Sequence, residues 1–237
     1  SRFGDVARGV MLDQPPIFLG GQGGAVGPVS IGFGAIAPAG AVVRRDAPEG
    51  GRLLVPEVVA IPGDFQPGLY RRIGRVVRRN LEYIGDLHAL KCWYDEVRRP
   101  FFAGSLEPLL EGALATLDRA LEERVRRLKE LAAKLERSID LGLAAGLETL
   151  EMARQQELYF HREEVAARLA AASAREPGVA DRDRFLRAVD DGRRRYGAAY
   201  RTVIPALPAD DRAAGTRWLE AVAAAPRTAV ADLLPSL

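Results

Sequence analysis

The residues with the clearest chemical potential in this chain are five arginines that fall between positions 71 and 79. They are Arg71, Arg72, Arg75, Arg78 and Arg79, and no acidic residue follows until Glu82. On a helix, such a run could form an anion-binding surface for nucleic acid, an anionic lipid surface or the phosphates of a nucleotide. Only Tyr70 supplies a nearby aromatic ring, so we favour a basic face packed beside acids of a helical hairpin or a neighbouring subunit. We expect no nucleic acid partner.

No catalytic, cofactor-binding or metal-binding residues are predicted. Glu157, His161 and Glu164 have the spacing of one helix face and could offer a metal two carboxylates and an imidazole. No matching pair occurs elsewhere, so an ion-paired solvated face is the favoured interpretation. Cys92 has no base placed beside it by spacing and is expected to be a packing residue, and His88 a partly buried helix residue with a local hydrogen bond. The sequence implies no particular cofactor.

Composition narrows the classes of protein further. The chain has 237 residues, a formal net charge of +2, 28% charged residues and a single cysteine. No apolar run approaches the ~20 residues of a membrane span. One cysteine cannot form an internal disulfide, which favours a reducing cytoplasm. The chain begins Ser-Arg-Phe-Gly without methionine or a signal peptide, which is typical of a fragment whose start is missing.

Glycine and proline concentrate at the N-terminal end, where a six-residue period is visible. Residues 1–68 hold 14 of the 24 glycines and 8 of the 15 prolines. Within them an aliphatic residue recurs every six positions, at Leu19, Ala25, Ile31, Ala37 and Val43. A parallel β-helix with three six-residue sides would point one such side chain per side into a narrow interior. The alternative is an ordinary pair of Gly/Ala-rich strands. The glycines of segment 20–24 then form a corner and not a phosphate-binding loop.

The residues Val29-Ser-Ile-Gly-Phe-Gly-Ala-Ile-Ala-Pro-Ala-Gly-Ala-Val-Val43 resemble the hexapeptide-repeat, left-handed β-helix superfamily. Extended back to Ile17, the segment is similar to the C-terminal region of bacterial sugar-1-phosphate nucleotidyltransferases, in particular proteins related to UDP-N-acetylglucosamine pyrophosphorylase. A looser likeness to their tail extends to about residue 139. The resemblance implies a missing upstream domain that would bind the sugar nucleotide. This chain would then serve assembly or positioning.

The remainder of the chain is predicted to be helical. Apolar residues recur every three or four positions over 69–97 and again along a stripe from Leu110 to Ile139, in a helix that starts at Ser105. The second stripe has the period of a coiled coil or helical hairpin, with charged residues at i,i+4 on its other face. Further helices are expected over 141–174, 184–203 and 212–225, with breaks at Pro205, Pro208 and Pro226.

The predicted fold is therefore mixed: a short left-handed parallel β-helix of hexapeptide repeats followed by a mostly α-helical bundle with a long helical hairpin. The expected units are residues 1–66, 67–176 and 177–237. The leading functional hypothesis is the C-terminal part of a nucleotidyltransferase-like transferase. A non-catalytic oligomerisation or interaction module and a hexapeptide acyltransferase acting on a sugar nucleotide are the alternatives. A cytoplasmic homo-oligomer, with a trimer as one form, is the expected state.

Overall fold

The computed structural model describes residues 1–55, 66–102, 104–172 and 177–237, and most of them are helical. The α-helices are α1 (Val6–Gly9), α2 (Ile73–Cys92), α3 (Glu107–Ala133), α4 (Leu135–Ala144), α5 (Thr149–Phe160), α6 (Arg162–Ala171), α7 (Val179–Tyr196), α8 (Tyr200–Ala206) and α9 (Ala209–Ala229). The end of α2 continues as a π-helix over Trp93–Arg98 and a 3₁₀ turn over Arg99–Phe101; a second 3₁₀ turn, Gly104–Leu106, precedes α3. None of these helices combines the length and apolar character needed to cross a bilayer.

Residues 1–55, here called the N-terminal segment, hold all the strands found in the described residues. They are β1 (Arg2–Phe3), β2 (Phe18–Leu19), β3 (Gly24–Ala25), β4 (Ser30–Ile31), β5 (Ile36–Ala37) and β6 (Val42–Val43). They form three two-stranded parallel sheets, β1–β4, β2–β5 and β3–β6, and two isolated parallel bridges, Ile31 to Ala47 and Ile36 to Leu53, extend the pairing. The prediction of a left-handed β-helix domain is therefore wrong, because the strands are two residues long and helices dominate the fold. The suspected membership of the hexapeptide-repeat superfamily is withdrawn with it.

The six-residue period led to the wrong fold prediction because it marks inward-facing residues but does not determine the length of the strands. Val29, Ile31, Ala35, Ala37, Ala41 and Val43 are buried together in a small core. Leu19 opens the predicted series, yet its side chain is 53% exposed. Alanine and valine bury little apolar area, so this core stabilises the segment weakly. The segment therefore depends on contacts with the helices.

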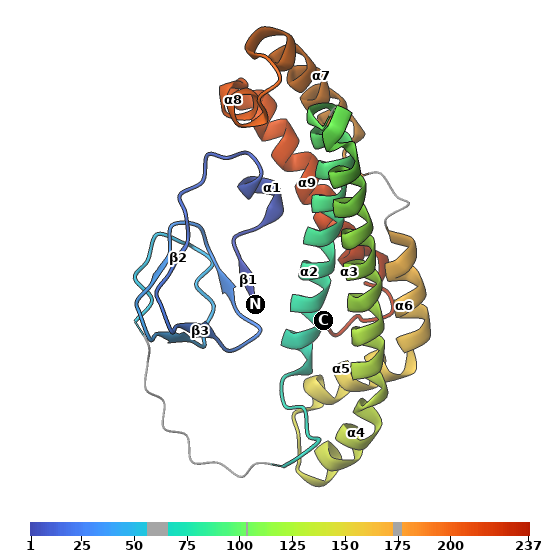
Figure 1. The fold of residues 1–237 in the computed structure, drawn as a ribbon. Coiled ribbons are helices and arrows are strands. Elements are labelled where there is room, and N and C mark those ends of the chain that lie inside the picture. The colour runs from blue at the N-terminus through green and yellow to red at the C-terminus, as the bar shows by residue number, and fades with distance from the viewer. Residues whose placement is uncertain (56–65, 103, 173–176) are drawn as a thin grey trace.

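Helix α2 is the centre of the helical body, with α3 antiparallel on one side and α9 crossing on another (Figure 1). One buried cluster joins α2 to α3, α5 and α6 through residues such as Leu81, Leu128 and Leu158. A second cluster gathers Trp93 and Phe185, whose rings stack at 5.8 Å, with side chains of α8 and α9. Met11, from the loop after α1, is 1% exposed in this second cluster, so the N-terminal segment is part of the helical core.

The helix boundaries differ from the sequence prediction where polar side chains or prolines act. Helix α2 begins at Ile73, four residues late, because the buried Glu151 carboxylate accepts the Ile73 N–H. The stripe expected to be one helix from residue 105 to 139 is two, since the chain breaks at Lys134. Pro205 and Pro226 lie inside α8 and α9, where they were expected to end helices. A proline near the last turn leaves only one carbonyl without its helical donor, so the helix continues.

Candidate functional site

The five arginines of the predicted anion-binding surface do not form one face. Arg71 and Arg72 lie exposed before α2, and Arg78 is exposed on it. Arg75 and Arg79 instead turn toward the N-terminal segment, where their guanidinium nitrogens lie 3.5 and 2.9 Å from the Asp46 carboxylate. The basic run is thus divided between an exposed part and a part that holds another segment of the chain.

Asp46 is the centre of the contact between α2 and the N-terminal segment, which we call a docking contact. Its Oδ1 also accepts the Ser30 N–H at 2.7 Å. Burial by itself would raise the pKa of Asp46, but the hydrogen bonds from Ser30 and Arg79 outweigh it and hold the pKa below its ordinary value. The carboxylate therefore stays charged at neutral pH.

A second docking contact joins strand β1 to α2. The Arg2 guanidinium donates from Nε and Nη2 to both oxygens of Asp86, at 2.6 and 3.0 Å. Asp86 is only 8% exposed. A bidentate pair of this kind fixes orientation as well as distance, so β1 is held in one position against α2.

The outer surface of the N-terminal segment carries a row of exposed apolar side chains. Phe18 pairs with Ile36 across β2 and β5, and Ile36 pairs in turn with Leu53. Paired residues of parallel strands point to the same side of the sheet, and these three side chains are 59%, 47% and 62% exposed. We call this row the apolar ladder. Sequence analysis missed the ladder because Phe18 and Ile36 each lie one position before a member of the six-residue series, and Leu53 lies outside that series. The spacing of 18 between Phe18 and Ile36 was visible in the sequence.

A cleft of about 490 Å³ lies between the N-terminal segment and helices α2 and α3. Arg2, Arg79 and Arg124 line it together with Asn80 and Tyr83. The Arg124 guanidinium lies over the Tyr83 ring, 5.1 Å from its centroid. Only Arg79 belongs to the predicted basic run. No local signal in the sequence connects residues 2 and 124 with it.

The remaining candidates have structural roles. Glu157 accepts both the backbone N–H and the hydroxyl of Ser236, and Glu164 pairs with Arg168. His161 is an exposed residue at the break between α5 and α6, so the three residues do not form a continuous face. Throughout the described ranges no group of three His, Cys, Asp or Glu side chains could hold a metal ion.

The two other motifs also serve the fold. Cys92 is half-buried and packs against the second core cluster, as expected. The glycines of segment 20–24 form the turn between β2 and β3, where a Cβ on Gly20 would lie 2.3 Å from the backbone nitrogen of Ala39. A larger residue at position 20 would therefore push the paired turn away.

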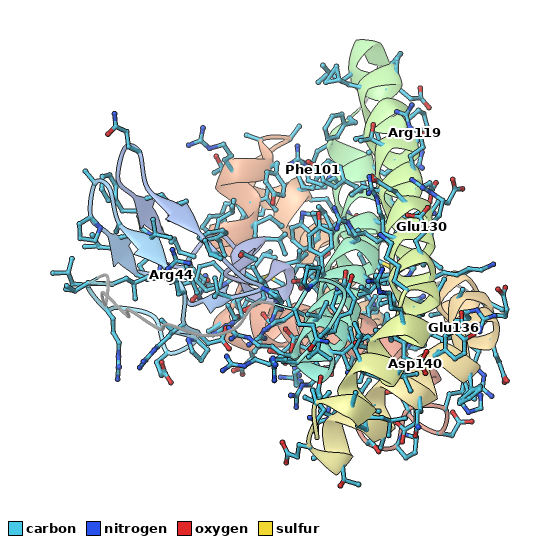
Figure 2. All side chains as sticks on the ribbon, turned by 90° about the horizontal axis from the view of Figure 1, so that it is seen from below. Arg44, Phe101, Arg119, Glu130, Glu136 and Asp140 are labelled. Carbon is cyan, nitrogen blue, oxygen red and sulfur yellow. The ribbon has the colours of Figure 1, made fainter. Side chains whose placement is uncertain are left out.

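The long α3–α4 stretch presents a charged outer face. Arg119, Glu130, Glu136 and Asp140 lie exposed along it (Figure 2). The expected i,i+4 ion pairs are confirmed at two places, Arg126–Glu130 at 2.6 Å and Arg127–Glu123 at 3.2 Å. Exposed pairs of this kind contribute little to stability, so this face is a solvated surface.

His88 is buried more deeply than expected, and its ionisation is coupled to folding. The residue is 6% exposed, and its Nε2 is buried without a hydrogen-bond partner among the described residues. Burial lowers the pKa of His88, the nearby Lys91 ammonium lowers it further, and Asp118 offsets this in part. The expected local hydrogen bond is therefore not found at this nitrogen.

We expect the protein to lose stability as the pH falls below about 6.5, because the unfolded chain then binds a proton that buried His88 resists. The free energy of unfolding, measured by urea titration between pH 7.5 and 5, should fall by at most about 1.4 kcal/mol per pH unit from this group. His88→Gln should flatten that slope, whereas His161→Gln, at an exposed position, should leave it unchanged. Equal slopes in all three proteins would contradict the assignment.

Comparison with known proteins found no match: no family model matches the chain, and neither a curated protein nor a solved structure is significantly similar to it.

Proposed function

We propose that this chain is a non-catalytic interaction module that self-associates through the apolar ladder. The observation that carries the proposal is the register of Phe18, Ile36 and Leu53, which aligns three exposed apolar side chains on one side of paired strands. Scattered exposed apolar residues are ordinary on protein surfaces, but an aligned row offers a continuous contact. The transferase interpretation rested on the β-helix resemblance and is not carried further.

A second copy of the chain is the partner that matches the ladder's own shape. Ile36 is its middle member, with Phe18 on one side and Leu53 on the other. A two-fold axis through Ile36 would place Ile36 against itself and each end of the ladder against the opposite end of the partner's. This is the self-complementary arrangement that a two-fold interface requires.

The docking contacts support this role because they hold the ladder rigidly. The pairs Arg2–Asp86 and Arg79–Asp46, together with the burial of Met11, attach the N-terminal segment to α2 and the second core. A segment held in one orientation loses little conformational freedom on association. The helical body therefore acts as the platform that presents the ladder.

The test is the molar mass in solution across a concentration series, measured by light scattering and sedimentation. Wild-type protein is expected to approach twice the mass of one chain as concentration rises. Phe18→Lys removes two exposed apolar anchors per dimer and places a charge against the apolar Leu53 of the partner copy at each end of the interface, so the dissociation constant should rise about 100-fold.

Leu143→Lys is the matched control. Leu143 is 67% exposed on α4, away from the ladder, so this variant should associate like the wild type. A wild-type mass of one chain at every concentration would overturn the proposal, as would equal weakening by Leu143→Lys and Phe18→Lys.

A further inference from the structure

We infer that the cleft between the N-terminal segment and helices α2 and α3 binds a phosphate monoester of a small organic molecule. This inference is independent of self-association, because the cleft uses none of the ladder residues. It also differs from the predicted basic face, since it shares only Arg79 with that set.

The first argument is the charge of the cleft wall. Three guanidinium groups reach it from separate parts of the chain, Arg2 from β1, Arg79 from α2 and Arg124 from α3. No carboxylate is among the described residues that line it. Planar guanidinium groups with several N–H donors are the preferred protein partners of phosphate oxygens.

The second argument is that two of these arginines are positioned by acids outside the wall. The described hydrogen bonds of Arg2 to Asp86 use Nε and Nη2, and those of Arg79 to Asp46 and Glu82 use its two Nη atoms. In the described part of the chain, no bond occupies Nη1 of Arg2 or Nε of Arg79. Each side chain is therefore held in place by an acid and still has an N–H donor that a ligand could use.

Arg124 supplies the charge that the acids do not neutralise. Across residues 1–55, 66–102, 104–172 and 177–237 no acidic side chain pairs with it, and its described contact is the face of Tyr83. A guanidinium stacked on an aromatic ring keeps its edge N–H groups available to an anion. Asp46 also pairs with Arg75, so the four arginines Arg2, Arg75, Arg79 and Arg124 face the three acids Asp46, Glu82 and Asp86. One positive charge remains, and it favours an anionic ligand.

The size and the remaining wall of the cleft point to an organic phosphate. Its volume of about 490 Å³ lies in the range of sites for small organic ligands and is larger than an inorganic phosphate needs. Val76, Pro28 and the Tyr83 ring supply apolar surface beside the arginines. A ligand with a phosphate at one end and an apolar or planar group at the other would contact both.

Calorimetric titration with phenyl phosphate and with inorganic phosphate tests this inference on the full chain. Phenyl phosphate should bind wild-type protein at least tenfold more tightly than inorganic phosphate. Arg124→Gln should weaken phenyl phosphate binding at least tenfold, because it removes the uncompensated charge while leaving both docking contacts intact.

Arg119→Gln is the matched control, since Arg119 is exposed on the same helix outside the cleft. It removes the same charge and should leave binding within twofold of wild type. Thermal melting without ligand should be alike for the two variants, which separates loss of binding from loss of folding. The inference would be overturned if neither probe bound at millimolar concentration, if inorganic phosphate bound as tightly as phenyl phosphate, or if both variants lost affinity equally.

Discussion

Gly85→Ala should lower the free energy of unfolding by about 3 kcal/mol, which corresponds to a fall in melting temperature of about 6–12 °C. A Cβ at position 85 would lie 2.0 Å from the carbonyl oxygen of Ala223. This atom belongs to the backbone of α9, so it cannot move aside as a side chain could. The two helices would have to separate along their contact, and side chains of both helices belong to the second core cluster. Thermal and urea unfolding, followed by circular dichroism, measure the loss.

Gly112→Ala provides the matched control for this prediction. Gly112 also lies inside a helix, in α3, but a Cβ there would meet nothing within 4 Å. The same substitution should therefore stabilise the protein by roughly 0.5–1 kcal/mol, because alanine has the higher helix propensity. If the two variants melted alike, the close crossing of α2 and α9 would be wrong.

Asp86→Ala is expected to release the N-terminal segment from the helical body. The substitution leaves the Arg2 guanidinium without its bidentate partner, and this side chain is 27% exposed. Removing one partner of a fully buried pair costs about 3–5 kcal/mol, and the partial exposure of Arg2 reduces this to roughly 2–3 kcal/mol. Hydrogen exchange in the N-terminal segment should accelerate, while exchange in α3 should stay slow.

Asp118→Ala serves as the comparison for that experiment. Asp118 also forms a short ion pair, with Lys91 at 2.5 Å, but the two side chains are 48% and 34% exposed. Its loss should cost less than about 1 kcal/mol and leave exchange in the N-terminal segment unchanged. Unchanged exchange in Asp86→Ala would show that the segment does not depend on this contact.

The sequence predicted the helices well where apolar spacing controls packing. The stripe over Leu110, Leu114, Leu117 and Leu121 faces α2 and the core, and all four side chains are buried. It failed where a boundary depends on a distant side chain. The start of α2 is set by Glu151, 78 positions further along the chain, and no local pattern contains that information.

The N-terminal segment was mispredicted for a different physical reason. Its glycines permit tight turns, so their regular spacing indicates where the chain turns and does not determine the length of the strands. The period identified Ile31, Ala37 and Val43 as inward-facing, and they are buried. It could not specify how many residues pair in each strand, since that depends on the whole set of neighbouring segments. Here each strand pairs over two residues.

The candidate site shows the same limit. A basic run was visible at residues 71–79, but its division was not, because Asp46 approaches only after the N-terminal segment folds against α2. The cleft required Arg2 and Arg124, which lie far apart in the chain. Tertiary contacts thus converted an apparent surface patch into a docking contact and one wall of a cleft.

The central claim is that the apolar ladder pairs with its own copy about an axis through Ile36, and site-directed cross-linking tests it most directly. In a Cys92→Ala background, Ile36→Cys places a thiol beside the proposed axis, and Leu143→Cys places one at an exposed control position. With a short bis-maleimide, the Ile36→Cys protein should form covalent dimers rapidly, Leu143→Cys should form few, and adding Phe18→Lys to Ile36→Cys should abolish the dimers. Equal yields from Ile36→Cys and Leu143→Cys would contradict the claim.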